Sequence, residues 1–168
     1  RELNDQSDID LVLNNVGLCY VSLRNSAKAI ESFNEALGKC KPNCSPAVII
    51  QANFGLGRAY NSTGDFERAS SFFKISLEHA EKQNDTRYVI ENLNNLGSNE
   101  RSLNNLKKSV EYSLEANDLA QRFRYIELQI DIFKELSTTY NLIHDFENAA
   151  LFQNRYIKLK DSIYSGDL

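Results

Sequence analysis

The chain has 168 residues, of which 42% are hydrophobic and 25% are charged, a balance typical of a folded globular protein. Its formal net charge is -4, and the 19 lysines and arginines form no basic tract, so we expect no nucleic-acid partner. No apolar run approaches the roughly 20 residues that cross a bilayer, which predicts no membrane insertion by these residues. The first residue is not Met, so we expect a fragment of a longer protein, and the compartment stays open.

Eight helical segments are expected in chain order, because apolar residues recur at helical spacing between polar turns. Within each pair of segments the turn is carried by Asn25-Ser26, Gly64-Asp65, Asn104-Asn105 and His144-Asp145, whose short side chains can cap a helix start. Longer breaks at 41–45, 83–86 and 123–125 separate the pairs. The expected helices are 8–24, 26–40, 46–63, 66–82, 86–103, 106–122, 125–142 and 146–163.

An internal repeat organises these segments. The residue numbers of Gly17, Gly57 and Gly97 are 40 apart, and the same step lands on the small residue Ser137. Two further columns keep this register on the second helix of each pair: Ala29, Ala69, Ser109 and Ala149, and then Phe33, Phe73, Ser113 and Gln153. We expect each glycine to let its helix approach the small-residue column of the partner helix closely. The sequence thus predicts four hairpins, at about 8–45, 46–85, 86–124 and 125–163, stacked as one all-α superhelix.

The second hairpin carries a recognisable signature. Leu56-Gly57-x-x-Tyr60, then Gly64-Asp65-Phe66, Ala69 and Phe73, resemble the tetratricopeptide repeat. The period of 40 exceeds the usual 34 of that family and is similar to the repeats of kinesin light chain and of Rap-type bacterial peptide receptors. This resemblance implies a right-handed solenoid that binds proteins and does not catalyse a reaction. Glu100 departs from the tyrosine column of Tyr20, Tyr60 and Tyr140.

The end of the chain carries a second resemblance. Residues 156–164 are similar to the segment that closes the repeat array in tetratricopeptide sensor histidine kinases of bacteria. This resemblance implies the alternative function of a ligand-sensing input domain in a signalling protein. An ordinary amphipathic capping helix explains the same residues.

No catalytic, cofactor or metal site is expected. The histidines His79 and His144 lie in different repeats, and no nucleophile with an oxyanion donor stands beside either. Cys40 and Cys44 lack the spacing and the further ligands of a zinc site. The two thiols would pair if the loop between them bent, but unpaired thiols are favoured.

The repeat register predicts which residues of the first helices line a concave peptide-binding groove. Amides dominate this set, and an asparagine can donate and accept hydrogen bonds at once, while Arg58 and Arg101 can fork onto carboxylates. Asn14-Asn15 and Asn94-Asn95 are similar to the inner-helix asparagines with which kinesin light chain and Rap-type receptors hold peptide backbones. The expected partner is a protein or peptide, and self-association is left open. The predicted groove residues are Asn14, Asn15, Phe54, Arg58, Asn61, Glu91, Asn94, Asn95, Ser98, Arg101, Lys134, Thr138 and Asn141.

Overall fold

The computed structural model describes residues 5–165, and every regular element within that range is an α-helix. The predicted all-α class is therefore confirmed, with helix ends within three residues of those expected. The helices are α1 (Asp5–Ser22), α2 (Ser26–Lys39), α3 (Pro46–Ser62), α4 (Phe66–Gln83), α5 (Thr86–Ser102), α6 (Leu106–Arg122), α7 (Ile126–Leu142) and α8 (Phe146–Ser165).

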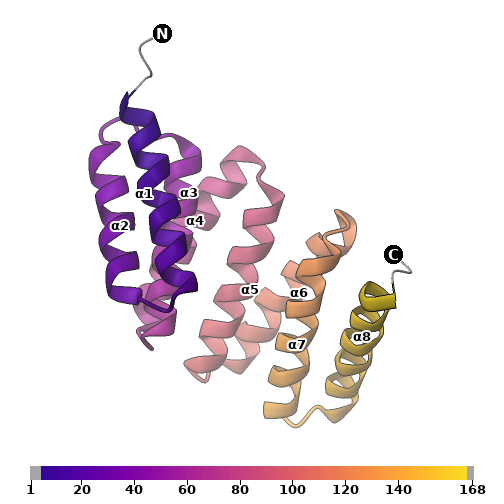
Figure 1. Cartoon of the computed structure of the whole chain (residues 1–168). Helices are drawn as coiled ribbons and strands as arrows, with labels where there is room; N and C mark the ends of the chain where they lie inside the picture. The colour runs from indigo at the N-terminus through magenta and orange to yellow at the C-terminus, as the bar shows by residue number, and fades with distance from the viewer. Residues whose placement is uncertain (1–4, 166–168) are drawn as a thin grey trace. The chain divides into compact units, whose positions relative to one another are not determined.

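The chain divides into two compact units, residues 1–88 and 89–168. In the first unit α1 packs on α2 and α3 on α4, and α3 also contacts α1 and α2 (Figure 1). In the second unit α7 packs against both α6 and α8. Each unit thus contains antiparallel helical hairpins, and the grouping of all four into one domain remains a prediction.

The turn inside each hairpin has the same backbone geometry. One residue per turn adopts the left-handed conformation, with a φ of 56° at Arg24, 81° at Gly64, 63° at Asn104 and 62° at His144. The N–H of the following residue then bonds to the carbonyl five residues earlier, as in Asp65 to Tyr60 at 3.1 Å. This bond closes the C-terminus of the first helix. Only the second hairpin places glycine, the residue without a steric penalty there, at the left-handed position.

Side-chain caps start the second helix of the hairpins where the sequence predicts them. The Oδ1 of Asn25 accepts from the Lys28 N–H at 3.2 Å, and the Oδ1 of Asp65 accepts from the Arg68 N–H at 3.1 Å. Each bond satisfies one of the free donors in the first helical turn. Asn105 occupies the equivalent position before α6 but makes no capping bond.

Two of the glycines that recur every 40 residues, Gly17 and Gly57, lie against aromatic rings. A Cβ added to Gly17 would lie 2.6 Å from a ring carbon of Phe33, and one added to Gly57 would lie 2.5 Å from a ring carbon of Phe73. Both separations are shorter than a carbon–carbon contact allows. At Gly17 and Gly57 the expectation that the glycine faces the small-residue column is therefore wrong, because the ring of the phenylalanine column fills the space that the missing side chain leaves. At Gly97 the expectation holds, since an added Cβ would lie 3.2 Å from the carbonyl oxygen of Ser109.

In the last two hairpins the two helices also cross closely, but the side chains at the crossing are different. Gly97 faces Ser113 in place of a phenylalanine. In the fourth hairpin the glycine is replaced by Ser137, whose Oγ lies 3.0 Å from the Ala149 carbonyl and 3.3 Å from Gln153 Oε1. Where the ring is lost, small and hydrogen-bonded polar groups fill the crossing.

The loop between α2 and α3 is closed by a disulfide. Cys40 and Cys44 are joined across a Cα–Cα distance of 4.6 Å, so the expectation of two unpaired thiols is wrong. The loop bends enough to bring the two cysteines within the range that a disulfide requires. Ser45 then caps α3 by accepting from the Val48 N–H at 3.3 Å, with Pro46 in the first helical turn.

Candidate functional site

The predicted groove residues lie on the first helices of the hairpins. In the first unit they belong to α1 and α3, and in the second unit to α5 and α7. Each group is described within its own unit.

Two of the predicted residues of the first unit are core residues. Asn14 is fully buried, and its Nδ2 donates to Gln51 Oε1 at 2.7 Å, which ties α1 to α3. Phe54 is 6% exposed and packs edge-on against Tyr88, with ring centroids 5.4 Å apart. Neither side chain is accessible to a peptide, so both assignments are corrected. The repeat register predicts both positions on the accessible side of their helices, but the two side chains are buried.

The accessible part of this first-unit surface centres on Arg58. Its side chain is exposed, and its guanidinium carbon lies 5.9 Å from the Phe54 ring centroid. A cation held over an aromatic face keeps its charge available while its orientation is restricted. Asn15 is also exposed, whereas Asn61 is half-buried and engaged in an interaction of its own.

In the second unit, Arg101 is already paired. Its Nε donates to Glu135 Oε1 at 2.6 Å and its Nη2 to Glu135 Oε2 at 3.2 Å, so the fork joins α5 to α7. The side chains are 27% and 11% exposed, and Nη2 also reaches Ser98 Oγ at 3.4 Å. The expectation that Arg101 forks onto a ligand is corrected, because the guanidinium binds a carboxylate of the chain itself.

Two asparagines of this surface are oriented by hydrogen bonds within their own helices. Asn95 Nδ2 donates to the Glu91 carbonyl at 2.7 Å, and Asn141 Nδ2 donates to the Ser137 carbonyl at 2.9 Å. Asn95 is half-buried and Asn141 is exposed. Each side chain is therefore held in one orientation, with one N–H of its amide group already used.

The remaining predicted residues differ in accessibility. Lys134 and Thr138 are exposed, although the Thr138 hydroxyl donates to the Lys134 carbonyl at 2.8 Å. Asn94 is half-buried, and its Oδ1 is buried without a hydrogen-bond partner among residues 5–165. Glu91 is half-buried and has a partner. Lys134 is therefore the exposed cation of the second-unit surface.

Known proteins share both the sequence signature and the fold. The profile of the tetratricopeptide repeat matches residues 12–38 and 50–81, which lie in the α1–α2 and α3–α4 hairpins whose packing is described above. The first two hairpins therefore match the tetratricopeptide repeat in sequence.

Three relatives illustrate how far the similarity extends. A 66-residue stretch is 33% identical to FK506-binding protein 5 of Rhizopus delemar and covers 39% of this chain and 16% of that protein. The structure superposes on aspartyl phosphate phosphatase F from Bacillus subtilis with a TM-score of 0.88 at 12% identity, over 99% of this chain and 43% of that one. It superposes on a signal-transduction ATPase with a tetratricopeptide-repeat sensor from Pyrococcus horikoshii with a TM-score of 0.85 at 16% identity, over 99% and 26% of the two chains. The chain thus spans less than half the length of each.

Glu100, the residue that interrupts the tyrosine column of the tetratricopeptide repeats, has a structural partner. In the second and fourth repeats Tyr60 and Tyr140 stack on a phenylalanine ring of the following helix. Glu100 is 6% exposed and accepts from Asn105 Nδ2 at 2.8 Å. The amide of Asn105 therefore binds a buried carboxylate, and this accounts for its missing helix cap. Sequence reasoning missed the pair because Asn105 fits the column of turn residues and gives no sign of a second role.

The environment of Glu100 alters a nearby tyrosine. Burial raises the pKa of Tyr112, and the negative charges of Glu100, Glu115 and Glu111 raise it further. A phenol whose folded-state pKa lies above its unfolded value of about 10 stabilises the fold below that value, and this stabilisation is lost as the pH rises through the folded-state pKa.

Removing the buried charge should therefore shift the titration of Tyr112. We expect Glu100→Gln to lower the pKa of Tyr112 towards its ordinary value, because the second cause of its elevation is removed. Carbon-13 NMR of the labelled tyrosine ring, followed through alkaline pH, measures this shift. Glu147→Gln, which removes a charge from α8, is the control, and an equal response to both substitutions would contradict the assignment.

The ion pair of Arg101 and Glu135 should stabilise the second unit. Arg101→Ala leaves the Glu135 carboxylate, which is 11% exposed, without the guanidinium that binds it. We therefore expect a loss of about 2 kcal/mol in the free energy of unfolding. A double-mutant cycle with Glu135→Gln, read by urea denaturation, isolates the interaction. Strictly additive losses would show that the pair contributes no coupling energy.

The structure offers little for catalysis or metal binding. Among residues 5–165, no group of three or more histidine, cysteine or acidic side chains could hold a metal ion. His144 is the left-handed residue of a hairpin turn, and its ring contacts that of Phe146 at 5.9 Å. The described helices include none that is long and apolar enough to span a bilayer.

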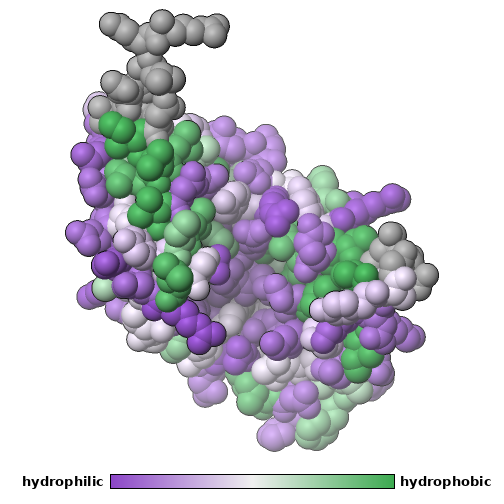
Figure 2. Space-filling view, in the orientation of Figure 1, coloured by the Kyte–Doolittle hydropathy of each residue, from purple (hydrophilic) through white to green (hydrophobic). Residues whose placement is uncertain are grey.

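An apolar stripe covers the outer face of α1 in the first unit. Val12 and Val16 are 58% and 37% exposed, and Figure 2 shows this surface as a green area over α1. The equivalent residues of α3, Ala52 and Leu56, are fully buried in a cluster with Ala29 of α2. On α3 this face packs against the preceding hairpin, whereas on α1 the equivalent face is exposed.

Proposed function

We propose that the chain is a protein-interaction scaffold that holds an extended segment of another polypeptide on the first helices of its repeats. The fold supports the general role, since tetratricopeptide repeats bind protein or peptide partners. The observation that carries the finer proposal is the half-buried side chain of Asn95, whose amide nitrogen is held by the Glu91 carbonyl within α5.

The chemistry of the surface suits a peptide backbone. An oriented amide oxygen accepts a hydrogen bond from a main-chain N–H whatever side chain the ligand carries. Because the helix fixes the orientation of the side chain, less conformational entropy is lost when the peptide binds. Arg58 in the first unit and Lys134 in the second add positive charge, so we expect acidic side chains in the preferred ligands.

A non-catalytic role follows from the same surface. Tetratricopeptide-repeat folds are generally non-catalytic, and the exposed members of the predicted groove set carry amides, a hydroxyl and isolated cations. A nucleophile, a base and an oxyanion donor within reach of one another are what an acyl- or phosphoryl-transfer site needs. We therefore propose binding without turnover.

Substitutions on the first helices should weaken a ligand without unfolding the chain. For a peptide selected from a display library on the immobilised chain, we expect Arg58→Ala and Asn95→Ala each to reduce affinity by about 1 to 3 kcal/mol, measured by calorimetry. Lys74→Ala and Asn154→Ala, which remove exposed side chains from α4 and α8, are the matched controls. Affinity that is lost with the controls but kept in the first pair would place the binding surface on the second helices.

A second candidate function is that of a sensor. The Pyrococcus horikoshii protein of similar fold carries a tetratricopeptide-repeat sensor, and residues 156–164 resemble the end of such arrays in sensor kinases. In this alternative, ligand binding alters the helical packing and transmits the change to an attached output domain. Small-angle scattering with and without the selected peptide distinguishes the two, since a plain scaffold keeps its radius of gyration.

A further inference from the structure

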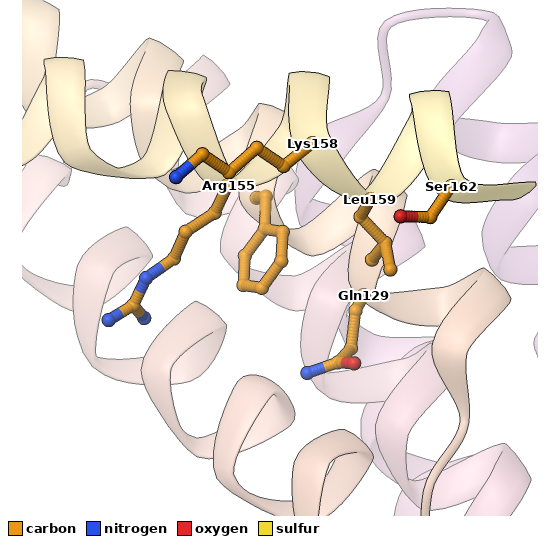
Figure 3. A pocket seen from close by; sticks show the side chains of 6 residues that line it. Gln129, Arg155, Lys158, Leu159 and Ser162 are labelled. Atoms are coloured by element: carbon orange, nitrogen blue, oxygen red, sulfur yellow. The ribbon is translucent and has the colours of Figure 1, made fainter. Parts of the chain in front are cut away.

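A pocket between α7 and α8 contains none of the predicted groove residues. Its volume is about 280 Å³, and Figure 3 shows Arg155, Lys158, Leu159 and Ser162 on α8 and Gln129 on the facing helix α7. The lining residues are Gln129, Phe133, Arg155, Lys158, Leu159 and Ser162. The pocket therefore combines two cations, two neutral polar groups and an apolar floor.

The cations of this pocket have no acidic partner. Within the part of the chain that the structure describes, neither Arg155 nor Lys158 forms an ion pair. Both side chains are exposed, and the guanidinium carbon of Arg155 lies 5.3 Å from the Phe152 ring centroid, which restricts its orientation. Two cations thus line one pocket.

The repeat register shows that this charge pattern is specific to α8. At the equivalent turn of α4, Glu78 pairs with Lys82 at 2.6 Å, and at that of α6, Asp118 pairs with Arg122 at 2.6 Å. In α8 the acidic position is held by Lys158 and the basic position by Ser162. Relative to α4 and α6, a negative residue is replaced by a positive one and the basic residue four positions later is replaced by serine. This turn of α8 is therefore positively charged, whereas the equivalent turns of α4 and α6 are neutral.

The floor of the pocket is apolar. Phe133 is 7% exposed, and Leu159 is half-buried. A hydrocarbon group placed here loses contact with water at a gain of about 25 cal/mol for each Å² of apolar surface buried. Charge interactions at the edge of such a floor are also stronger than in bulk water.

We propose that this pocket binds an anion that carries an apolar group, with the charged head between Arg155 and Lys158 and the apolar body over Phe133 and Leu159. The site is independent of the proposed peptide surface on the first helices. A fatty carboxylate and the carboxyl end of a peptide share this chemistry, and the experiment below distinguishes them.

Octanoate is the first probe. Titrated into nitrogen-15-labelled chain, it should shift the amide signals of the pocket residues in a saturable manner, with a dissociation constant in the range of about 0.1 to 1 mM that such small ligands reach. Octanol and octylamine, which have the same hydrocarbon body but a neutral or a cationic head, should bind at least about tenfold more weakly. Octanol binding as tight as octanoate would overturn the assignment of an anion site.

Variants of the two cations locate the head group. Arg155→Gln and Lys158→Glu, the latter restoring the acidic residue of α4, should each weaken octanoate about fivefold or more. Lys160→Gln, which removes one positive charge as Arg155→Gln does but from a residue of α8 outside the pocket, should leave the affinity unchanged. Equal effects of all three would show general charge attraction and contradict a defined site.

N-acetylleucine separates the two sources of ligand. Binding of N-acetylleucine as tight as that of octanoate would indicate recognition of a chain-terminal carboxylate, and tighter binding of octanoate would indicate a fatty anion. Absence of saturable shifts with both compounds would overturn the proposal. The proposed peptide surface is tested separately with the Arg58→Ala and Asn95→Ala variants. The results with octanoate and N-acetylleucine therefore do not depend on that surface.

Discussion

Replacing Phe33 with alanine is expected to lower the free energy of unfolding by about 3 to 5 kcal/mol. The ring is fully buried, and it fills the space left by Gly17 of α1 and by Gly55 of α3. Its removal therefore opens a cavity shared by three helices, which cannot collapse without moving all of them. Urea denaturation followed by circular dichroism measures the loss.

Phe123 provides the matched control for this prediction. It is the same residue type but is 52% exposed, in the turn between α6 and α7. Phe123→Ala should change the free energy of unfolding by less than about 1 kcal/mol, because little buried surface is lost. Similar losses in both variants would contradict the packing described for Phe33.

Replacing Gly57 with leucine is expected to cost about 3 kcal/mol and to lower the melting temperature. Even the first carbon of the new side chain would overlap the Phe73 ring, which is itself fully buried and cannot move aside. The hairpin of α3 and α4 must then separate. Differential scanning calorimetry measures the shift.

Gly38 offers the opposite result from the same residue type. It lies within α2, and a Cβ added there meets no atom within 4 Å. Gly38→Ala should therefore stabilise the chain by about 0.5 to 1 kcal/mol, since alanine restricts the unfolded chain and favours the helix. A melting temperature unchanged by Gly57→Leu would mean that the α3–α4 crossing is not as described.

The sequence predicts the helices and turns well because these depend on neighbouring residues. Asn25 and Asp65 cap helices through bonds to the third residue beyond them, so spacing alone locates both turns. The glycine column was found for the same reason. Its contact was assigned to the alanine column instead of Phe33 and Phe73, because a repeat register fixes which residues are equivalent and does not say how deeply a ring inserts.

Much of the candidate site could not be predicted, because its residues bind one another across helices. The repeat register predicts Arg101 on the groove wall, but its ion pair with Glu135 depends on the approach of α5 and α7. The burial of Asn14 depends in the same way on Gln51 of α3. Glu100 is visible in the sequence as a departure from the tyrosine column, but its partner Asn105 fits the column of turn residues, so only the structure reveals the pair.

Hydrogen exchange with a bound peptide tests the central claim most directly. A peptide selected on the chain should slow amide exchange in the first helices that carry the proposed contacts, α3, α5 and α7, more than in their partners α4, α6 and α8, because ligand binding stabilises the segments it touches. Arg58→Ala should reduce this protection in α3. Protection confined to α4, α6 and α8 would contradict the account and place the interaction surface on the second helices.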